Sequence, residues 1–288
     1  MPDTVTIQPA ALASRALPWH AELALGYTFD AGRTVLARRH HRGPLVVQKA
    51  LYPEGDAVCH TIVVHPPGGI AGGDRLEIRA SAGSSSHVLL TTPGAAKWYR
   101  ANGREASQTV RLDIADNAIV EWLPQETIVF DAAQARIDMT IELQRDARYF
   151  GWDIAVLGRR ASGERFESGA LRQATTIRRD GREVYVERTM LAGGDALLDS
   201  PVGLAGCHVF GTLIATAKAC DDALVDACRE LAPEDGARHG VTRLPEVLIA
   251  RYLGGSPQAA RFYFAALWSR LRPRLAGREA CMPRIWQT

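Results

Sequence analysis

Short runs rich in valine, isoleucine and threonine recur from Trp19 to about Met190, and this recurrence constrains the fold more than any other feature of the chain. Turn-forming sequences such as Asn102-Gly103 and Asp180-Gly181 separate the runs. No strong 3.6-residue periodicity interrupts the region, so the pattern predicts a long antiparallel β body. The expected strands cover residues 34–37, 45–48, 61–65, 87–91, 109–114, 119–123, 137–143 and 183–189.

The C-terminal third has the pattern of two helices. Asp221 can cap a helix whose apolar residues follow helical spacing and which has to stop before Pro233. Ser256-Pro257 supplies an N-cap followed by proline at the first helical position, and we expect the helix that begins there to end near Pro273. Residues 247–253, between the two helices, are predicted to form a strand.

These patterns predict one compact unit over residues 19–288. It consists of the β body over 19–200 and a small β-α-β-α portion over 201–288. We expect residues 1–18 to form a flexible N-terminal lead, because the recognisable pattern begins after them. No internal repeat or linker divides the unit.

Composition excludes several classes of protein. The chain carries 34 Lys plus Arg against 32 Asp plus Glu, a formal charge of +2, and 47% hydrophobic residues. That content argues against disorder as the main state, and the small net charge argues against a nucleic-acid binder. The arginine excess over lysine fits either genome composition or a surface that docks acidic partners.

Targeting signals and cysteine patterns are also missing from the sequence. We see no secretory signal, and residues 200–217 are too broken by glycine and proline to span a bilayer as a helix. The five cysteines are scattered and form no CxxC pair, which argues against a disulfide scaffold or a structural zinc site. A cytoplasmic location without membrane contact is therefore expected.

The loop His65-Pro66-Pro67-Gly68-Gly69-Ile70-Ala71-Gly72-Gly73-Asp74 is the most unusual stretch of the chain. A P-loop requires a lysine followed by serine or threonine after its last glycine, whereas Asp74 stands there and would repel phosphate. The dinucleotide fingerprint is absent as well. The loop is thus either a structural double turn between strands or part of a site that is not built for nucleotides.

A second loop, over residues 92–100, ends in Lys97, Trp98, Tyr99 and Arg100. It is either a turn whose aromatic residues cover an edge of the core or an exposed docking patch, because Trp, Tyr and Arg are enriched at interface hot spots. No nucleophile elbow, HExxH motif or Cys-His grouping with a known catalytic spacing accompanies it.

Three carboxylates adjoin apolar runs, namely Asp74, Asp153 and Glu187. A buried carboxylate has to be paired, coordinate a metal or face water, because an isolated buried charge is too costly. His60 and His65 lie close in sequence, but an odd spacing on a strand directs them to opposite faces, so a two-histidine metal site is disfavoured.

An ordered set of short motifs across nearly the whole chain resembles the UreD family of urease accessory proteins, called UreH in some organisms. The matching motifs are Gly43-Pro44-Leu45, Tyr52-Pro53, Cys59-His60, the stretch from His65 to Asp74, Thr92-Pro93-Gly94-Ala95, Lys97-Trp98-Tyr99-Arg100, Trp122-Leu123-Pro124-Gln125-Glu126, Trp152-Asp153, Leu157-Gly158-Arg159, Glu187-Arg188 and Pro283-Arg284-Ile285-Trp286. Two positions depart from the pattern, since Trp98 often is Phe and Ala96 can be Ser in the family.

The resemblance implies a non-catalytic scaffold with a mainly β fold of stacked, β-helix-like strands and a pair of helices. Such a protein assembles with UreF and the GTPase UreG on apo-urease, in two copies within a symmetric complex, and helps to install nickel. It implies no tightly bound cofactor and no nucleic-acid partner. The loop residues Lys97, Trp98, Tyr99 and Arg100, together with Trp268 of the second expected helix, are candidates for the UreF interface.

The family is also associated with an internal, water-filled passage for nickel(II). Transit of a divalent cation requires weak, exchangeable oxygen or imidazole ligands, as in the acidic rings of cation channels. By resemblance and chemistry, the candidate lining residues are Asp74, Asp153 and Glu187, followed by Asp56 and His65.

Two other classes of function stay open at this point. One is a small metal-dependent hydrolase that uses His65 and Asp74, which predicts tight stoichiometric metal and turnover without partners. The other is a generic β-rich binding module, which predicts ligand binding without any effect on urease.

Overall fold

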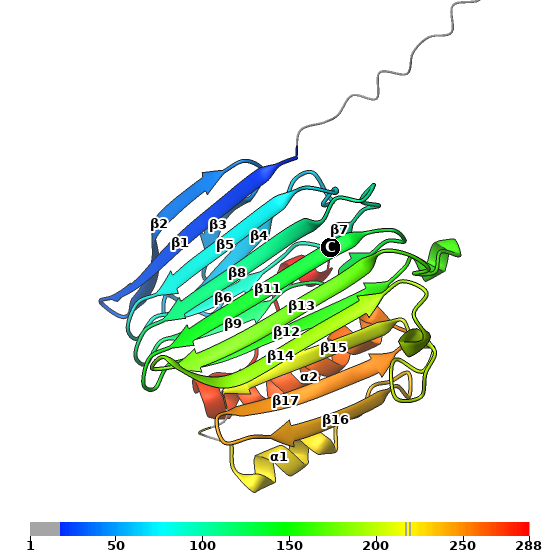
Figure 1. Cartoon of the computed structure of the whole chain (residues 1–288). Helices are drawn as coiled ribbons and strands as arrows, with labels where there is room; N and C mark the ends of the chain where they lie inside the picture. The colour runs from blue at the N-terminus through cyan, green and yellow to red at the C-terminus, as the bar shows by residue number, and fades with distance from the viewer. Residues whose placement is uncertain (1–17, 217, 219, 288) are drawn as a thin grey trace, which may run out of the picture.

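Two stacked β-sheets and two helices make up the described part of the molecule (Figure 1). The computed structural model describes residues 18–216, 218 and 220–287. The first sheet contains, in spatial order, β14 (Arg182–Ala192), β13 (Ala170–Arg179), β11 (Gln134–Leu143), β8 (Ala106–Ile114), β5 (Arg75–Ala82), β1 (His20–Asp30) and β2 (Arg33–Arg42).

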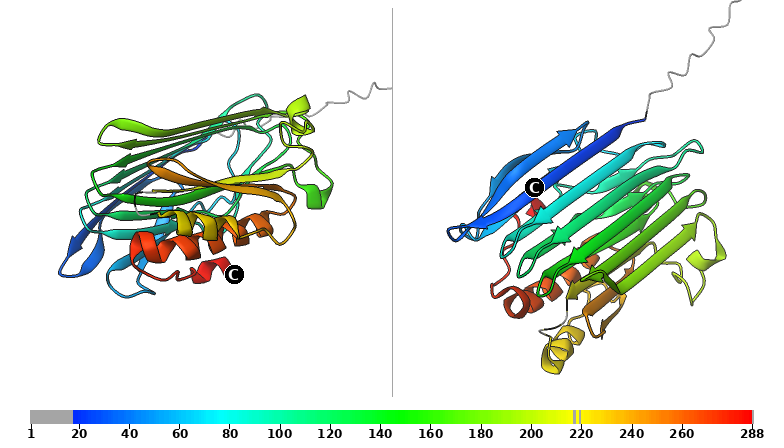
Figure 2. Two further views of the ribbon diagram at one scale, coloured as in Figure 1. Left: turned by 90° about the horizontal axis from the view of Figure 1, so that it is seen from below. Right: turned by 60° about the vertical axis from the view of Figure 1, so that its left-hand side comes forward.

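The second sheet lies behind the first and carries the helices on its far side (Figure 2). Its order is β16 (Arg238–Arg243), β17 (Val247–Gly254), β15 (Val209–Thr216), β12 (Arg148–Leu157), β9 (Ile119–Leu123), β6 (His87–Thr91), β4 (Val58–Val64) and β3 (Val46–Leu51), while β10 (Thr127–Val129) pairs with β12 and with β7 (Ala96–Trp98). The helices are α1 (Asp222–Arg229) and α2 (Pro257–Ala276), with 3-10 turns η1 (Arg160–Ser162), η2 (Ala196–Leu198) and η3 (Arg284–Gln287).

The chain winds between the two sheets as a solenoid. From β4 onward it passes alternately from one sheet to the other, so β5, β8, β11 and β13 pair in parallel in the first sheet. Strands β4, β6, β9 and β12 do the same in the second. The mainly β fold with stacked strands and two helices is therefore confirmed.

The predicted antiparallel direction is wrong for these central strands. Antiparallel pairs occur at the margins, where β1 meets β2, β3 meets β4 and β13 meets β14, and in the run β12–β15–β17–β16. The turn signals lie between strands as expected. Some turns, such as Asp180-Gly181 between β13 and β14, lead the chain back along its neighbour, whereas others, such as Asn102-Gly103 between β7 and β8, lead it across to the other sheet. Turn chemistry alone does not distinguish these outcomes.

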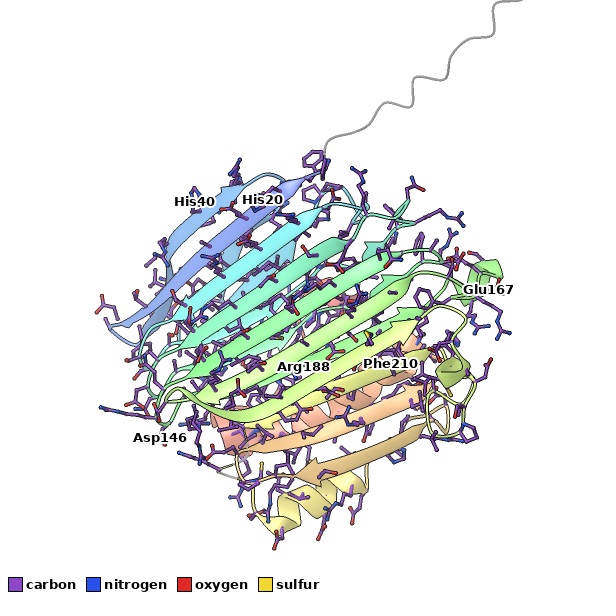
Figure 3. The ribbon with its side chains drawn as sticks, viewed as in Figure 1. His20, His40, Asp146, Glu167, Arg188 and Phe210 are labelled. Carbon is purple, nitrogen blue, oxygen red and sulfur yellow. The ribbon has the colours of Figure 1, made fainter. Side chains whose placement is uncertain are left out.

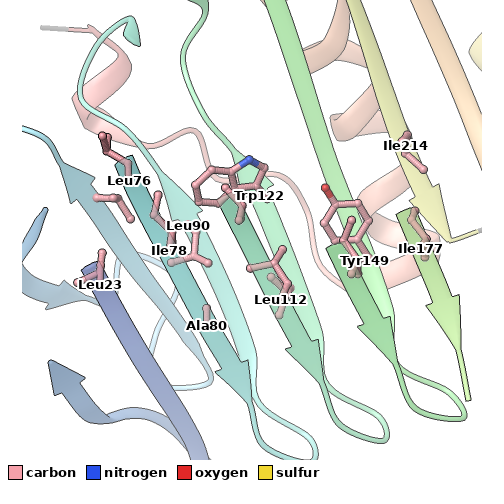
Figure 4. Close-up of a cluster of buried hydrophobic side chains, with 14 of the residues drawn as sticks. Leu23, Leu76, Ile78, Ala80, Leu90, Leu112, Trp122, Tyr149, Ile177 and Ile214 are labelled. Carbon is pink, nitrogen blue, oxygen red and sulfur yellow. The ribbon is translucent and has the colours of Figure 1, made fainter. Parts of the chain in front are cut away.

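Period-two alternation divides the buried residues into two cores. On β12, Tyr149, Ala155 and Leu157 belong to the cluster between the sheets, whereas Phe150 and Trp152 belong to the cluster beneath α2. Figure 4 shows part of the layer between the sheets, with Leu76 and Ile78 of β5 facing Leu90 and Trp122 of the second sheet. The second sheet is thus covered on both faces.

The outer face of the first sheet is polar (Figure 3). Arginines and acids two residues apart on one strand form ion pairs there, as Arg111 does with Asp113 and Arg136 does with Asp138. Arginines on this face therefore form ion pairs within the molecule. Their charged groups keep the face in contact with water.

Both predicted helix starts are confirmed. Asp221 caps α1 by accepting the Leu224 amide, and Ser256 caps α2 by accepting the Ala259 amide. The helix extends slightly beyond its expected end near Pro273: Pro273 lies in the last turn, α2 ends at Ala276, and the C-cap residue Gly277 adopts a left-handed conformation.

The portion after residue 200 contains one strand more than predicted, in the order β15, α1, β16, β17, α2. Its strands continue the second sheet through the antiparallel pair β12–β15. Most of the predicted flexible lead, residues 1–17, lies outside the described residues. In the described part of the chain, neither helix has the length and apolar character needed to cross a bilayer.

Candidate functional site

A polar zone interrupts the core between the sheets. The inward-facing row of β13 begins with Leu171 and ends with Ile177, both fully buried, but Gln173 and Thr175 stand between them. On β14 the same row carries Glu187 and Thr189 between buried Tyr185 and Leu191. The sheets consequently enclose polar side chains in the middle of an otherwise apolar layer.

Two cavities occupy this zone. The wider, of about 630 Å³, opens among β13, β14, β15 and β17, and the narrower, of about 320 Å³, extends toward the glycine loop. Asp153, Gln173 and Thr175 contribute to the walls of both. The cavities therefore adjoin at these three residues, and the two together are called the route below.

Asp153 lies at this junction. Strand alternation directs its side chain away from α2 and into the layer between the sheets, where Gln173 Nε2 donates to Oδ1 over 3.4 Å. Burial, and next the nearby Glu187 carboxylate, raise the pKa of Asp153 to about 7, although Gln173 and Arg251 partly oppose the shift. The residue can thus hold or release a proton near neutral pH.

Glu187 and Arg251 form an ion pair at the wall of the wide cavity. Arg251 Nη1 donates to Glu187 Oε1 over 2.5 Å, and Tyr185 Oη donates to Glu187 Oε2 over 2.8 Å. The Glu187 side chain is 19% exposed and that of Arg251 55% exposed. Glu187 therefore has a cation partner from another strand, 64 residues away in sequence.

His65 and Lys97 lie at the narrow end of the route. Both line the narrower cavity, together with Gly68, Gly69 and Ile70 of the glycine loop. Burial lowers the pKa of His65, and the Asp74 carboxylate partly offsets that effect. A largely neutral imidazole is available at this end as a weak ligand.

The glycine loop needs its glycines for close contact. A Cβ atom on Gly69 would lie 2.1 Å from the Tyr99 ring, and one on Gly72 would lie 2.3 Å from the Ala101 carbonyl oxygen. Ile70 forms an isolated bridge with Trp98 and exchanges backbone hydrogen bonds with Lys97 and Tyr99. The two loops singled out in the sequence are thus packed against each other, and no helix follows the glycines.

The Asp74 carboxylate accepts hydrogen bonds that fix the backbone of the glycine loop. Its Oδ1 accepts the Trp19 amide and its Oδ2 accepts the Ala71 amide, each over 2.8 Å. Asp74 is absent from the walls of both cavities. Asp56 lies elsewhere, with a 65% exposed side chain 3.6 Å from Arg33 Nε. The structure thus gathers Asp153, Glu187 and His65 along the route and leaves Asp74 and Asp56 outside it.

The five predicted interface residues divide into two groups. Lys97, Tyr99 and Arg100 are exposed, and their contact with a partner stays a prediction. Trp98 and Trp268 are at most 1% exposed, because they fill the cores above and below the second sheet. Neither indole offers a contact surface in this fold, which corrects their placement at an interface.

Sequence reasoning missed a buried polar network beneath α2. The carboxylate of Glu121, on β9, accepts from His87 Nε2 over 2.5 Å, from Trp268 Nε1 over 2.5 Å and from Arg272 Nη2 over 2.9 Å. Burial alone would raise the pKa of Glu121, but His87 and Arg272 lower it below its ordinary value.

Arg272 extends this network to the loop before β4. Its Nη1 donates to Glu54 Oε2 over 2.6 Å, and His60 Nε2 lies 2.6 Å from Glu54 Oε1. Two features of the sequence could have indicated the network. Glu121 is the only charged residue in an apolar strand, and Arg272 lies on the apolar stripe of its helix. His60 and His65 point to opposite faces of the second sheet, as their spacing predicted.

Among the described residues, no group of three or more His, Cys, Asp or Glu side chains is arranged to hold a metal ion. The route between the sheets offers separate oxygen and imidazole ligands, at Asp153, Glu187 and His65. Such a series suits brief contacts with a passing cation better than permanent coordination.

Comparison with known proteins gives a consistent result. A family model described as "UreD urease accessory protein" matches residues 20–287. A protein of Dechloromonas aromatica named "Urease accessory protein UreD" is 56% identical over 273 residues, covering 94% of this chain and 95% of that protein. Proteins of the same name from Azoarcus sp. and Methylobacillus flagellatus are 51% and 48% identical, covering 94% and 99% of this chain and 94% and 100% of their own lengths.

Proposed function

The chain belongs to the UreD family of urease accessory proteins, and on this premise we propose that it is a non-catalytic scaffold that passes nickel to urease. In this proposal it assembles with UreF and the GTPase UreG on apo-urease, in two copies within a symmetric cytoplasmic complex. Nickel(II) is the cargo, and this chain provides part of its route.

The adjoining cavities between the sheets are the observation that carries this proposal. They extend from the glycine loop to the margin of β14 and β17, and they share Asp153, Gln173 and Thr175 as polar wall residues. A divalent ion cannot cross an apolar core, whereas a water-filled space with spaced carboxylates keeps it solvated.

The ligands along the route are suited to exchange. Asp153 and Glu187 face the wide cavity, while His65 lies at the far end of the narrow one. Asp153 is held by a single long hydrogen bond, so it can turn toward an ion at little cost. Oxygen and imidazole ligands presented singly bind nickel weakly enough to release it.

Reconstitution of urease tests the proposal. Apo-urease, nickel, GTP, UreF and UreG are combined with the wild-type chain, without it, or with the double variant Asp153→Asn, Glu187→Gln. We expect full urease activity with the wild type, and at least a tenfold loss without the chain or with the double variant. Glu183→Gln, at the exposed end of the same strand β14, is the matched control and should activate as the wild type does.

The results separate scaffold and passage. Equal activation with and without the chain would reject the scaffold. Full activation by the double variant, with both partners still bound in a pull-down, would reject the passage through these residues.

A further inference from the structure

Arg251 lies at the wide end of the route, in register with Asp153. In the second sheet, Asp153 pairs with Thr212 and Thr212 pairs with Arg251, so the three residues form one row across β12, β15 and β17. Alternation along β17 places Leu248 and Ala250 in the cluster beneath α2, and Arg251 therefore points into the layer between the sheets.

The guanidinium group of Arg251 is fastened on the cavity side by three contacts. Besides its bond to Glu187, Nη1 donates to Thr212 Oγ1 over 3.2 Å, and Nη2 donates to Tyr185 Oη over 3.4 Å. The contacts with Glu187 and Tyr185 join β17 of the second sheet to β14 of the first, and the contact with Thr212 joins β17 to its neighbour β15. The side chain remains 55% exposed, so it can swing outward into solvent without disturbing the core.

Among the residues that line the wide cavity, the carboxylates outnumber the cations that pair with them. Asp153 and Glu187 are its carboxylates, and Arg251 is the one cation that forms an ion pair with either of them in the described part of the chain. Arg238 and His239 also line the cavity, but the described residues contain no carboxylate within ion-pair distance of either side chain. Two acids thus share a single fixed counter-ion.

We propose that Arg251 is the resident counter-ion of the Asp153–Glu187 carboxylate pair, and that a divalent cation has to displace it in order to pass. This inference rests on the proposed function, and it assigns selectivity for divalent ions to a residue that itself binds no metal. In the absence of cargo, the guanidinium occupies the Glu187 carboxylate and keeps the pair close to neutral.

The exchange follows from charge. A divalent ion attracts the two carboxylates more strongly than one guanidinium does, whereas a monovalent ion gains nothing over Arg251. The displaced side chain stays tethered to β17 at a high effective concentration, so it returns and releases the ion. The Arg251 contact thus makes nickel binding both selective and reversible.

Nickel binding to the purified full-length chain tests this inference. Isothermal titration with nickel sulfate at one pH and salt concentration compares the wild type with Arg251→Gln and with Arg238→Gln. Both variants lose one positive charge from the same cavity, but only the first removes the counter-ion. We expect Arg251→Gln to bind nickel about tenfold more tightly and Arg238→Gln to stay within about twofold of the wild type.

Two further variants test whether the effect comes from freeing the carboxylate pair. Thr212→Val removes a hydroxyl that fastens the guanidinium and leaves every charge in place, so we expect it to tighten nickel binding by about threefold. Adding Asp153→Asn to Arg251→Gln should abolish the gain in affinity. Thr212→Val also provides a test if Arg251→Gln does not fold, as judged by circular dichroism.

Unchanged or weaker nickel binding in the variants that remove or loosen Arg251 would overturn the inference. Equal tightening in Arg251→Gln and Arg238→Gln would overturn it too, since that result indicates a general effect of charge. These outcomes are independent of urease activation, whose failure to depend on Asp153 and Glu187 would reject the proposed passage instead.

Discussion

The carboxylates of this chain differ in the hydrogen bonds that fix their positions. Asp74 accepts two backbone amides and fixes the glycine loop to Trp19, whereas Asp153 has one long bond and faces a cavity. The first arrangement stabilises a loop. The second leaves the carboxylate available to a cation, at a cost in folding free energy.

Asp74→Asn should destabilise the fold without acting through the nickel route. An amide offers one acceptor oxygen where two amide donors have to be satisfied, so we expect a loss of about 1–3 kcal/mol in the free energy of unfolding. Urea denaturation measures this loss. Asp56→Asn, on an exposed aspartate, is the control and should change stability by less than about 0.5 kcal/mol. Similar values for the two variants would contradict the loop-fixing role.

Asp153→Asn should stabilise the metal-free protein in a pH-dependent way. The pKa of Asp153 is raised from 3.8 to about 7, so the folded state holds this proton more tightly than the unfolded state does. Stability contributed by the protonated form is present at low pH and is lost as the pH rises through about 7. The variant avoids that loss, and its advantage should be absent near pH 4 and largest above pH 7.

We expect an advantage on the order of 2 kcal/mol at pH 8, because one pKa unit corresponds to about 1.4 kcal/mol and the wet cavity reduces the effect. Urea denaturation of wild type and variant at several pH values measures it. An advantage that is independent of pH would contradict this account and would indicate a packing effect.

At the scale of structural elements, the glycine loop and the Lys97–Arg100 loop form one packed unit. Gly72→Ala should destabilise it by about 2–3 kcal/mol, because the new Cβ would lie 2.3 Å from a backbone oxygen that cannot move away alone. Gly94→Ala, in open space at a backbone angle that alanine accepts, is the matched control and should be neutral. Thermal unfolding followed by circular dichroism compares the two, and equal melting temperatures would contradict the packing argument.

Local patterns predicted the elements better than their arrangement. Strands at 87–91 and 119–123 have the predicted bounds, and Asp221 and Ser256 cap helices as expected, because these features depend on near neighbours. The direction of strand pairing depends on where the chain goes after each turn. The parallel solenoid was therefore beyond what the turn signals could specify.

The same division applies to the candidate site. Period-two alternation correctly separated His60 from His65. The position of Asp153 next to an apolar run singled the residue out, but whether it is enclosed depends on the packing of the two sheets. The partner of Glu187 could not be predicted, since Arg251 comes from a strand of the other sheet. The partners of Asp74 could not be predicted either, because they are backbone amides, which every sequence contains.

On the scale of the whole molecule, the second sheet depends on a polar anchor as well as on its two apolar cores. Arg272 of α2 joins Glu121 of β9 and Glu54 of the loop before β4 within a network of buried side chains. The network spans segments more than 200 residues apart in sequence. It therefore connects the C-terminal helix to the early part of the solenoid.

Arg272→Met should be strongly destabilising, because it leaves two buried carboxylates without their shared cation. Such a loss costs about 3–5 kcal/mol, whereas Arg274→Met, which breaks an exposed pair with Asp221 on the same helix, should cost at most about 1 kcal/mol. Urea denaturation at neutral pH measures both.

The anchor should also make stability depend on pH. Burial raises the pKa of Glu54, but His60 and Arg272 lower it to about 2. This part of the stability is therefore present above pH 4.5 and is lost as the pH falls toward 2. The wild type should therefore lose more stability than Arg272→Met between pH 5 and pH 3, and parallel losses would show that Arg272 does not hold the anchor together.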